Sequence, residues 1–519
     1  MQLVPTRILP VALSSILALA GCSGTGGTSL SDAGTDAGTD AGTDAGVDAG
    51  AVPTINAFTA APNSLPTGGG PVALTWDVTG ATALSIDQGV GAVAPLDAGT
   101  KTVLVGATTT FTLTATNATG NSTMTAPVTV APVPPTQTVS GTVVDDNGQP
   151  VSGETVLIVA ASFSQMVVSD ADGAFTVADV PTPYDATIVE AAQAIQYKGL
   201  TRPDPSLTAF IFLPNNSSAT LTGHFDGGIF PETQGYVTDF IFASPQTVKN
   251  LQDQPSGAFS ATIAWPGPTT TAGTLYALQI HIDAGLPADY PSYGALSGVV
   301  LQAGETSAGQ VVNLSPVTAG FLSGTVTFPT NYNLLFKSIA LSVASNVSLN
   351  LLTDSDGDAG FAYVTPEIPA TSLLVAAAAT SSAGEYSAIT KSGQPANGSG
   401  LVLAIQAAPL LVDPANSATS VSTATPFTWT PYEGAVYEFR ATSSSGPAFY
   451  VFTAATTGTL PDLSSAGLPL PTSTEYSWSI VSFAPVASVD LLASPGGIND
   501  LTLDLSEGLS LTRTFTTEP

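Results

Sequence analysis

Apolar and polar residues alternate along most of the chain after residue 53, which is the period of a β-strand with one buried face. In PVALTWDVTG, for example, the alternation places Val72, Leu74 and Trp76 on one side of a strand. Gly, Pro and Asn recur between these short segments and indicate turns, and no long segment has the apolar period of a helix. The pattern predicts an all-β fold, and the length of 519 residues predicts a tandem array of about five β-sandwich domains.

The first of these modules is expected at residues 53–131. It contains the stretches ALTWDVTGATALSIDQGVG and TTTFTLTATNATG. Their succession of strands and turns resembles that of bacterial Ig-like domains. The resemblance implies a β-sandwich, and we expect Trp76 to lie in its core rather than to contact a ligand.

The second module is expected at residues 137–216. It contains VSGTVVDDNGQPVSGETVLIV and, further on, SDADGAFTVADVPTPYDATI. An SGTV strand, a DxxGxPVxG turn and a DADGxF hairpin together resemble the carboxypeptidase-regulatory-like, or transthyretin-like, β-sandwich. The Asp and Gly residues shape turns in that family, as their own chemistry favours, and the resemblance implies a module that is not catalytic.

Parts of this second module recur later in the chain. LTGHF at 221–225 and LSGTV at 322–326 echo its first strand, and TDSDGDAGFAYVTPEIP echoes its hairpin. We therefore expect two further related sandwiches, at residues 217–318 and 319–409, of which the first is the more divergent. Since repeats of this kind stack as units, we expect each to bury its own core and the array to be extended.

The last module is expected at residues 410–519, and its aromatic strands resemble fibronectin type III-like domains. The rings expected in its core are Trp429, Tyr437 and Trp478. Phe449 and Tyr450 fit a core strand as well, and we favour that over an aromatic binding surface.

The chain begins with a basic and then apolar stretch, residues 1–21, that has the form of a secretory signal peptide. It ends in Leu19, Ala20 and Gly21, followed by Cys22, the single cysteine of the chain. These four residues resemble the bacterial lipobox. The resemblance implies cleavage before Cys22, lipidation of its thiol with fatty acids such as palmitate, and, with Ser23 next, an outer-membrane location. An ordinary signal peptide with an incidental cysteine is the alternative that we favour less.

Residues 22–52 are dominated by an Asp-Ala-Gly repeat with an aspartate every fourth residue. A helix would align these carboxylates, and the glycines would weaken it further. The composition predicts a disordered, self-repelling linker. Calcium binding by the repeat is an alternative without a defined ligand geometry.

Charge narrows the range of partners. With 39 acidic and 9 basic residues, the chain has a net charge of -30 at pH 7. Such a chain repels nucleic acid. The membrane, reached through the lipid, and an extracellular glycan or protein are the partners that we expect.

The two histidines give the sharpest candidate for a metal site. Each is followed two residues later by an aspartate, in GHFDG and IHIDAG, so each pair shares a strand face. If the two strands were neighbours, two imidazoles and two carboxylates would suit zinc. The four residues are His224, Asp226, His281 and Asp283. We favour the alternative, in which both are solvent-facing polar strand faces.

A second candidate is weak calcium binding by TDSDGD, through Asp354, Asp356 and Asp358. The segment lacks the continuation of an EF-hand, and its similarity to the hairpin of the second module favours a plain turn. We expect no other cofactor and no catalytic residue. The sequence therefore predicts a non-catalytic cell-envelope lipoprotein that acts in adhesion, ligand binding or surface scaffolding. The alternative is a carbohydrate- or peptide-binding accessory protein to a secreted hydrolase.

Overall fold

The computed structural model describes residues 51–145, 148–210, 215–233, 235–252, 256–283, 285–495 and 504–519. The predicted signal peptide, Cys22 and all but the last two residues of the predicted linker lie outside these residues. The regular elements of the described residues are β-strands, apart from the short helix α2 (Val489–Leu492) and the 3-10 turn η2 (Ser464–Ala466). The prediction of an all-β fold built of tandem β-sandwiches is confirmed.

The first module is a sandwich of the sheets β1-β3-β6 and β2-β8-β7-β4-β5. Val72, Leu74 and Trp76 point into its core, as the alternation predicted, and the indole N–H of Trp76 donates to the carbonyl of Pro95 at 2.9 Å. The strands are β1 (Thr54–Ala61), β2 (Ser64–Leu65), β3 (Gly70–Thr79), β4 (Ala83–Ile86), β5 (Gly91–Ala92), β6 (Ala98–Val105), β7 (Thr109–Asn117) and β8 (Gly120–Val130).

Three sandwiches of one topology follow, which we call the first, second and third repeat. The first comprises β9 (Thr136–Val144), β10 (Thr155–Ala160), β11 (Phe163–Val168), β12 (Ala174–Pro181), β13 (Tyr184–Val189), β14 (Gln193–Leu200) and β15 (Ser206–Thr208). The second comprises β16 (Ser217–Asp226), β17 (Tyr236–Ser244), β18 (Thr247–Gln252), β19 (Ala258–Trp265), β20 (Thr270–Asp283), β21 (Leu286–Gln302), β22 (Thr306–Asn313) and β23 (Ser315–Pro316). The third comprises β24 (Thr318–Thr327), β25 (Tyr332–Ala344), β26 (Val347–Asp354), β27 (Gly360–Glu367), β28 (Ser372–Ser381), β29 (Tyr386–Gln394) and β30 (Gly398–Ala404).

Each repeat has the same two layers. The smaller layers are β12-β9-β15, β19-β16-β22 and β27-β24-β30, and in each the central strand has one antiparallel and one parallel neighbour. The larger layers contain β11-β10-β13-β14, β18-β17-β20-β21 and β26-β25-β28-β29. The strands that echo one another in sequence, β9, β16 and β24, take the same central place. The second repeat thus shares the topology despite its divergent sequence.

A glycine in each central strand explains the motif that these strands share. It pairs with a phenylalanine of the antiparallel neighbour: Gly141 with Phe175, Gly223 with Phe259, and Gly324 with Phe361. A Cβ atom on Gly324 would lie 2.2 Å from the carbonyl oxygen of Leu401 and 2.5 Å from the Phe361 ring. Glycine is needed because backbone and ring already fill the place of a side chain.

We expect Gly324→Ala to lower the free energy of unfolding by about 1–3 kcal/mol, the usual cost of overpacking a closed site. The control is Gly360→Ala in the same sheet, where an added Cβ meets no atom within 4 Å. That control should stay within about 0.5 kcal/mol of the wild type. Urea denaturation measures both, and equal midpoints for the two variants would contradict the explanation.

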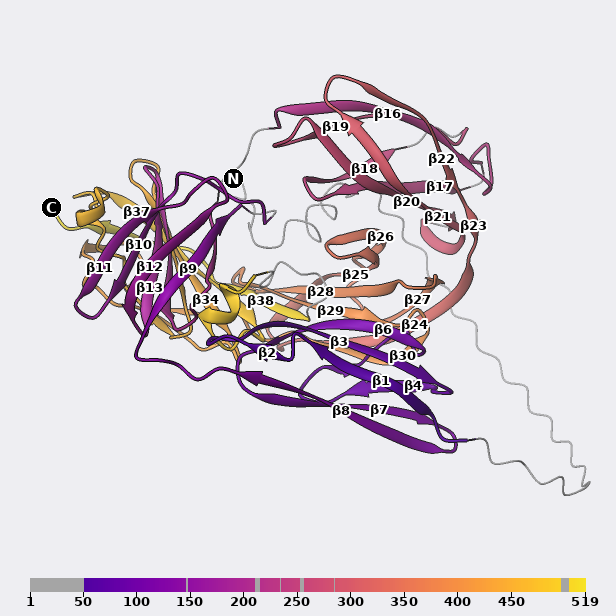
Figure 1. Cartoon of the computed structure of the whole chain (residues 1–519), viewed down its shortest axis with the longest axis horizontal. Coiled ribbons are helices and arrows are strands. Elements are labelled where there is room, and N and C mark those ends of the chain that lie inside the picture. Colours follow the sequence, from indigo (N-terminus) through magenta and orange to yellow (C-terminus); the bar gives the residue numbers. More distant parts are fainter. Residues whose placement is uncertain are drawn as a thin grey trace, which may run out of the picture.

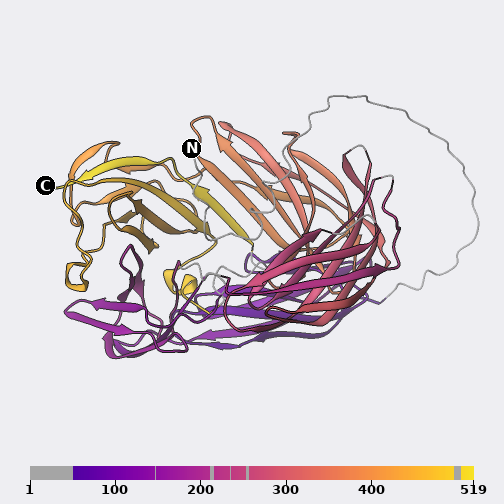
Figure 2. The same cartoon turned by 90° about the horizontal axis from the view of Figure 1, so that it is seen from above.

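The last module joins the first and third repeats into one sheet. Its strands are β31 (Leu411–Asp413), β32 (Ala418–Val421), β33 (Phe427–Trp429), β34 (Val436–Thr442), β35 (Ala448–Thr453), β36 (Thr457–Gly458), β37 (Glu475–Ala484), β38 (Leu505–Leu509) and β39 (Arg513–Thr517). Strand β35 pairs in parallel with β14, and β38 pairs antiparallel with both β37 and β29. The result is a 14-stranded sheet. Both views show the last module, in yellow, beside the orange third repeat and the violet first repeat (Figures 1 and 2).

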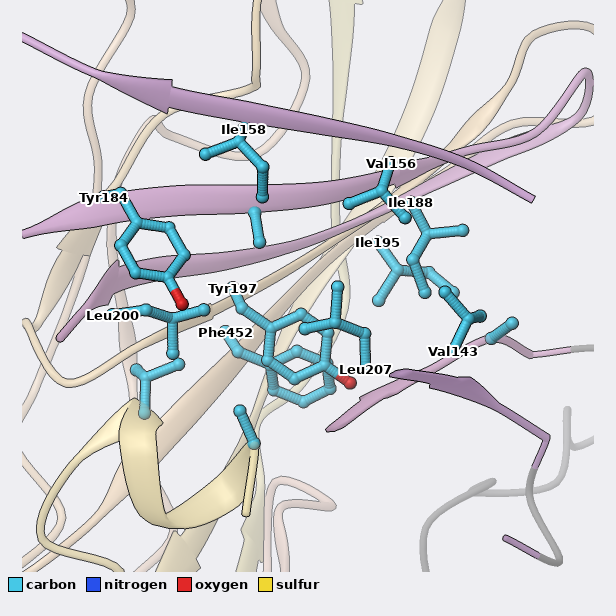
Figure 3. Packing of buried hydrophobic residues seen from close by; sticks show 14 of the residues in the cluster. Val143, Val156, Ile158, Tyr184, Ile188, Ile195, Tyr197, Leu200, Leu207 and Phe452 are labelled. Carbon is cyan, nitrogen blue, oxygen red and sulfur yellow. The ribbon is translucent and has the colours of Figure 1, made fainter. Parts of the chain in front are cut away.

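The shared sheet is buried on both faces where two modules meet. Phe452 of β35 enters the core of the first repeat, where its ring lies 4.9 Å from that of Tyr197 (Figure 3). Its neighbour Phe449 belongs instead to the core of the last module, together with Leu157 and Ala194 of the first repeat. Strands with apolar residues on both faces are typical of sheets covered on both sides.

The expectation that each unit buries its own core in an extended array is therefore wrong for the first repeat, the third repeat and the last module, whereas the first module and the second repeat each have a core cluster of their own residues. The cores of the first repeat and the last module are continuous across β14 and β35. The second repeat likewise packs Ile241, Leu278 and Ile280 against the core of the third. The free edges of neighbouring sandwiches, which a sequence pattern treats as surface, are used to join the modules.

Candidate functional site

The structure places the two histidine–aspartate pairs in different sheets. His224 and Asp226 are exposed on β16, which pairs with β19 and β22. His281 and Asp283 lie at the end of β20, which pairs with β17 and β21. The condition for the zinc site, that the two strands be neighbours, is not met. The described residues contain no group of three or more His, Cys, Asp or Glu side chains placed to hold a metal ion.

The ring of His281 is engaged elsewhere. It stacks on Tyr236, with ring centroids 4.4 Å apart, and its Nδ1 lies 3.4 Å from Oδ2 of Asp289. These contacts hold the tip of the β20–β21 hairpin against β17. The arrangement fits a surface strand pair better than a metal site.

Three aspartates at the end of β26 and in the loop that follows surround a lysine ammonium. Lys337 reaches into the loop from β25, and its Nζ lies 3.2 Å from Asp354, 2.6 Å from Asp356 and 2.6 Å from the carbonyl oxygen of Asp358. The lysine side chain is 1% exposed. The ammonium therefore takes the place among these oxygens that a bound cation would need.

The carboxylates of this loop also shape its turn. The carboxylate of Asp354 accepts a hydrogen bond from the backbone N–H of Asp356. The carboxylate of Asp356 in turn accepts one from the backbone N–H of Asp358. Burial by itself would raise the pKa of Asp354. The hydroxyl of Tyr363, the Asp356 N–H and the Lys337 ammonium outweigh burial and bring this pKa below its usual value. The loop is an Asx-type turn closed around an internal cation.

A buried arginine holds three modules together. Arg202, in the loop after β14, is 1% exposed, and its Nη1 donates to the carbonyls of Gly69 in the first module and Asp490 in helix α2 of the last. Its Nη2 donates to Asp204 at 2.8 Å. The carboxylate of Asp490 accepts from the backbone N–H groups of Arg202 and Thr201 and from the Thr201 hydroxyl.

A second buried ion pair joins the first module to the last module, next to the third repeat. Nζ of Lys101 lies 3.1 Å from Oδ1 of Asp504 and 2.6 Å from the hydroxyl of Ser392 in the third repeat. Lys391 reaches the other oxygen of Asp504 at 3.2 Å. Burial would raise the pKa of Asp504, but the two lysines and the Ser392 N–H hold it below its usual value.

A cavity of about 250 Å³ lies beside this pair, between the first and last modules. Residues in its wall include Leu104, Val105, Phe111, Val486 and Leu505, with Lys101 and Asp504 at one side. The charged groups of this wall are already paired with each other. Because Gln88, Thr102 and Thr109 also line it, the cavity offers a ligand polar and apolar contacts in about equal measure.

Two buried carboxylates share one arginine in the strands that connect the last module to the third repeat. Arg440 donates from Nε and Nη2 to both oxygens of Glu438, at 2.9 and 2.8 Å. Glu507 of β38 is also buried. Burial raises its pKa to about 7; Arg440 opposes this rise and Glu438 adds to it.

This carboxyl makes stability depend on pH. Its neutral form is favoured in the folded state, so its full contribution is present below the unfolded pKa of about 4.5 and is lost as pH rises through 7. We expect unfolding free energy to fall by roughly 3 kcal/mol over that interval. Glu507→Gln should flatten the slope, whereas the exposed control Glu305→Gln should keep it. Urea denaturation at pH 5, 6, 7 and 8 measures this, and an unchanged slope in Glu507→Gln would contradict it.

The aromatic residues predicted for the core of the last module lie in that core. Trp429, Tyr437 and Trp478 are buried, and Phe449 has no exposed surface. Tyr450 packs against the core of the first repeat and makes an edge contact with Phe210 at 4.9 Å. The alternative of an aromatic binding surface at Phe449 and Tyr450 is therefore wrong.

Sequence reasoning missed the buried cations, although a signal was available. The chain has only 9 basic residues in 519. The structure gives Lys101, Arg202, Lys337 and Arg440 internal carboxylate or carbonyl partners. In so acidic a chain, each isolated lysine or arginine is a candidate for such a role.

Comparison with known families supports the reading of the first repeat. Residues 138–209 match the model of the carboxypeptidase regulatory-like domain. The match covers most of β9 and the strands β10 to β15. No curated protein matches the sequence.

Solved structures that are similar to this chain have low sequence identity and low TM-scores. The TIE protein of Bacillus anthracis is 10% identical, with 67% of this chain and 74% of that one covered and a TM-score of 0.13. A Ca2+-stabilized, ice-binding adhesin of an Antarctic bacterium is 13% identical, with 67% and 99% covered and a TM-score of 0.13. The FN1-FN3 domains of chicken CNTN1 are 12% identical, with 59% and 100% covered and a TM-score of 0.14. Among the described residues, no helix is long and apolar enough to cross a membrane.

Proposed function

We propose that this chain is a non-catalytic lipoprotein of the bacterial cell envelope, anchored through Cys22 in the outer membrane. Its fused β-sandwich body serves in adhesion or in binding an extracellular glycan or protein. Nucleic acid is not among the proposed partners, because a net charge of -30 repels phosphate.

The anchor is supported by the residues Leu19 to Cys22 and by the acidic repeat that follows them. More than one acyl chain gives stable membrane attachment, whereas one chain binds only marginally. A chain such as residues 23–52 spans roughly 30 Å as a flexible coil. The body would therefore stand clear of the bilayer surface.

The observation that carries the role of the body is the shared 14-stranded sheet. It fixes the first repeat, the last module and the third repeat in one frame, so their loops keep constant relative positions. Buried pairs at Arg202 and Lys101 add the first module to this frame. A rigid frame lowers the entropic cost of binding a large partner.

The anchor is tested by fractionation of cells that express the wild type, Cys22→Ala or the control Ser23→Ala. We expect the wild type and the control to incorporate labelled palmitate, to sediment with outer membranes and to be cut by protease added outside intact cells. Cys22→Ala should incorporate no label. Equal labelling of wild type and Cys22→Ala would overturn the anchor.

The role in binding is tested separately, with the full chain on glycan arrays and in pull-downs of surface proteins. Binding to either class supports the proposal. Hydrolysis of an offered glycan or peptide, abolished by replacement of a carboxylate, would show an enzyme instead and overturn it.

A further inference from the structure

Strand β11 is one end of the shared sheet. It pairs with β10 over six residue pairs without a register shift, and no other described strand pairs with it. At the other end, β26 lies against β17 and β21 of the second repeat. Of these two ends, β26 therefore contacts another repeat, whereas no described strand pairs with the outer edge of β11.

The open edge lacks the devices that usually block strand addition. Edge strands are commonly protected by charged residues, proline, bulges or very short length. The sequence of β11 is FSQMVV, with no charge and no proline. Two other edge strands are interrupted: β12 has a register shift after Val177, and β1 has one after Ile55.

The edge also exposes apolar side chains on one face. Met166 is 52% exposed and Val168 is 58% exposed, and Val159 of β10 lies on the same face. On the opposite face, Phe163 and Val167 pack against the core of the first repeat. Between the exposed residues and β13, Leu157 is already covered by the last module. Met166, Val168 and Val159 thus extend, toward the sheet edge, the apolar face that the last module buries at Leu157.

This chain joins its own modules by adding strands to such edges, at β14 with β35 and at β29 with β38. We propose that β11 continues the same sheet into a second copy of this chain, by antiparallel pairing with β11 of that copy. Pairing about a two-fold axis at Met166 sets each Met166 against the other and Ser164 against Val168 of the second copy. This register keeps both apolar faces on one side, as the period of two requires.

The proposed pairing of the two β11 strands brings no charged residues of the two copies together. Two copies with a net charge of -30 repel each other over most of their surface. Between Thr155 and Val168 there is no charged residue. The nearest carboxylate along the strand, Asp170, would face Ser162 of the second copy rather than another carboxylate. The interface is isologous and closes as a dimer.

Disulfide trapping tests the register. In a full chain that carries Cys22→Ala, kept in detergent, Met166→Cys supplies the one thiol. Opposed residues of an antiparallel pair have Cα atoms about 4.5–5.5 Å apart, which suits a disulfide. Mild oxidation should convert most of this variant to a covalent dimer. The matched control, Ser140→Cys on the exposed face of the central strand β9, should stay monomeric.

A second measurement covers the uncrosslinked protein. In sedimentation equilibrium of the Cys22→Ala chain, Val168→Lys should weaken self-association by about tenfold or more, since lysine blocks an edge. Val300→Lys, at an equally exposed valine of β21, should leave it unchanged. A monomeric Met166→Cys variant after oxidation, or one crosslinked to a different protein, would overturn the proposal. Because Cys22 is absent throughout, these outcomes do not depend on the lipid anchor.

Discussion

Replacing Arg202 by alanine is expected to lower the free energy of unfolding by about 3–5 kcal/mol, the cost of breaking a buried ionic network from one side. The carbonyl oxygens of Gly69 and Asp490 would each lose a buried donor. An unsatisfied buried polar group costs about 1–3 kcal/mol. The loss falls on the contact among the first module, the first repeat and the last module.

The matched control is Lys198→Ala. Lys198 pairs with Asp185 at 3.6 Å, and both side chains are about one third exposed. Such a pair contributes about 0–1 kcal/mol, so the control should unfold nearly as the wild type does. Denaturant unfolding gives both values, and limited proteolysis reports whether the first module is released. Equal stability of the two variants would contradict the assigned role of Arg202.

The second large effect is expected for Lys337→Ala, at roughly 3 kcal/mol of unfolding free energy. The substitution leaves Asp354 and Asp356 facing each other without the ammonium that neutralises them. The exposed Lys249 supplies the control, and Lys249→Ala should be nearly neutral. Thermal unfolding of the three proteins measures the difference.

Calcium distinguishes the internal cation from a metal site. In the wild type the Lys337 ammonium holds the oxygens of the loop, so millimolar calcium should leave the melting temperature unchanged. In Lys337→Ala, calcium should recover part of the lost stability, since oxygen ligands suit it. A clear rise in the wild type would show that TDSDGD binds calcium after all.

Local pattern was sufficient to predict much of the fold. Alternation placed Trp76 in a core, because a strand with one buried face has an apolar residue at every second position. The echo of VSGTV in LTGHF and LSGTV predicted related strands, and Gly141, Gly223 and Gly324 explain it, because each lies under a phenylalanine ring.

The joining of modules was not predictable in the same way. Pairing of β14 with β35 connects residues that are more than 250 positions apart, from Gln193 with Ala448 to Tyr197 with Phe452. Strand β35 is apolar on both faces, but its sequence does not indicate which partner covers the second face. The ion pairs are equally long-range, since Lys101 meets Asp504 only when the first and last modules are assembled.

Hydrogen exchange of β29 tests the central claim, that one sheet runs through the first repeat, the last module and the third repeat. In this account residues 386–390 are paired on both sides, by β28 and β38. Mass spectrometry should find their amides exchanging slowly, at the rate of the central strand β28. The edge strand β18, paired only with β17, supplies the comparison. If about half of the β29 amides exchange as fast as those of β18, the strand is a free edge and the modules are separate.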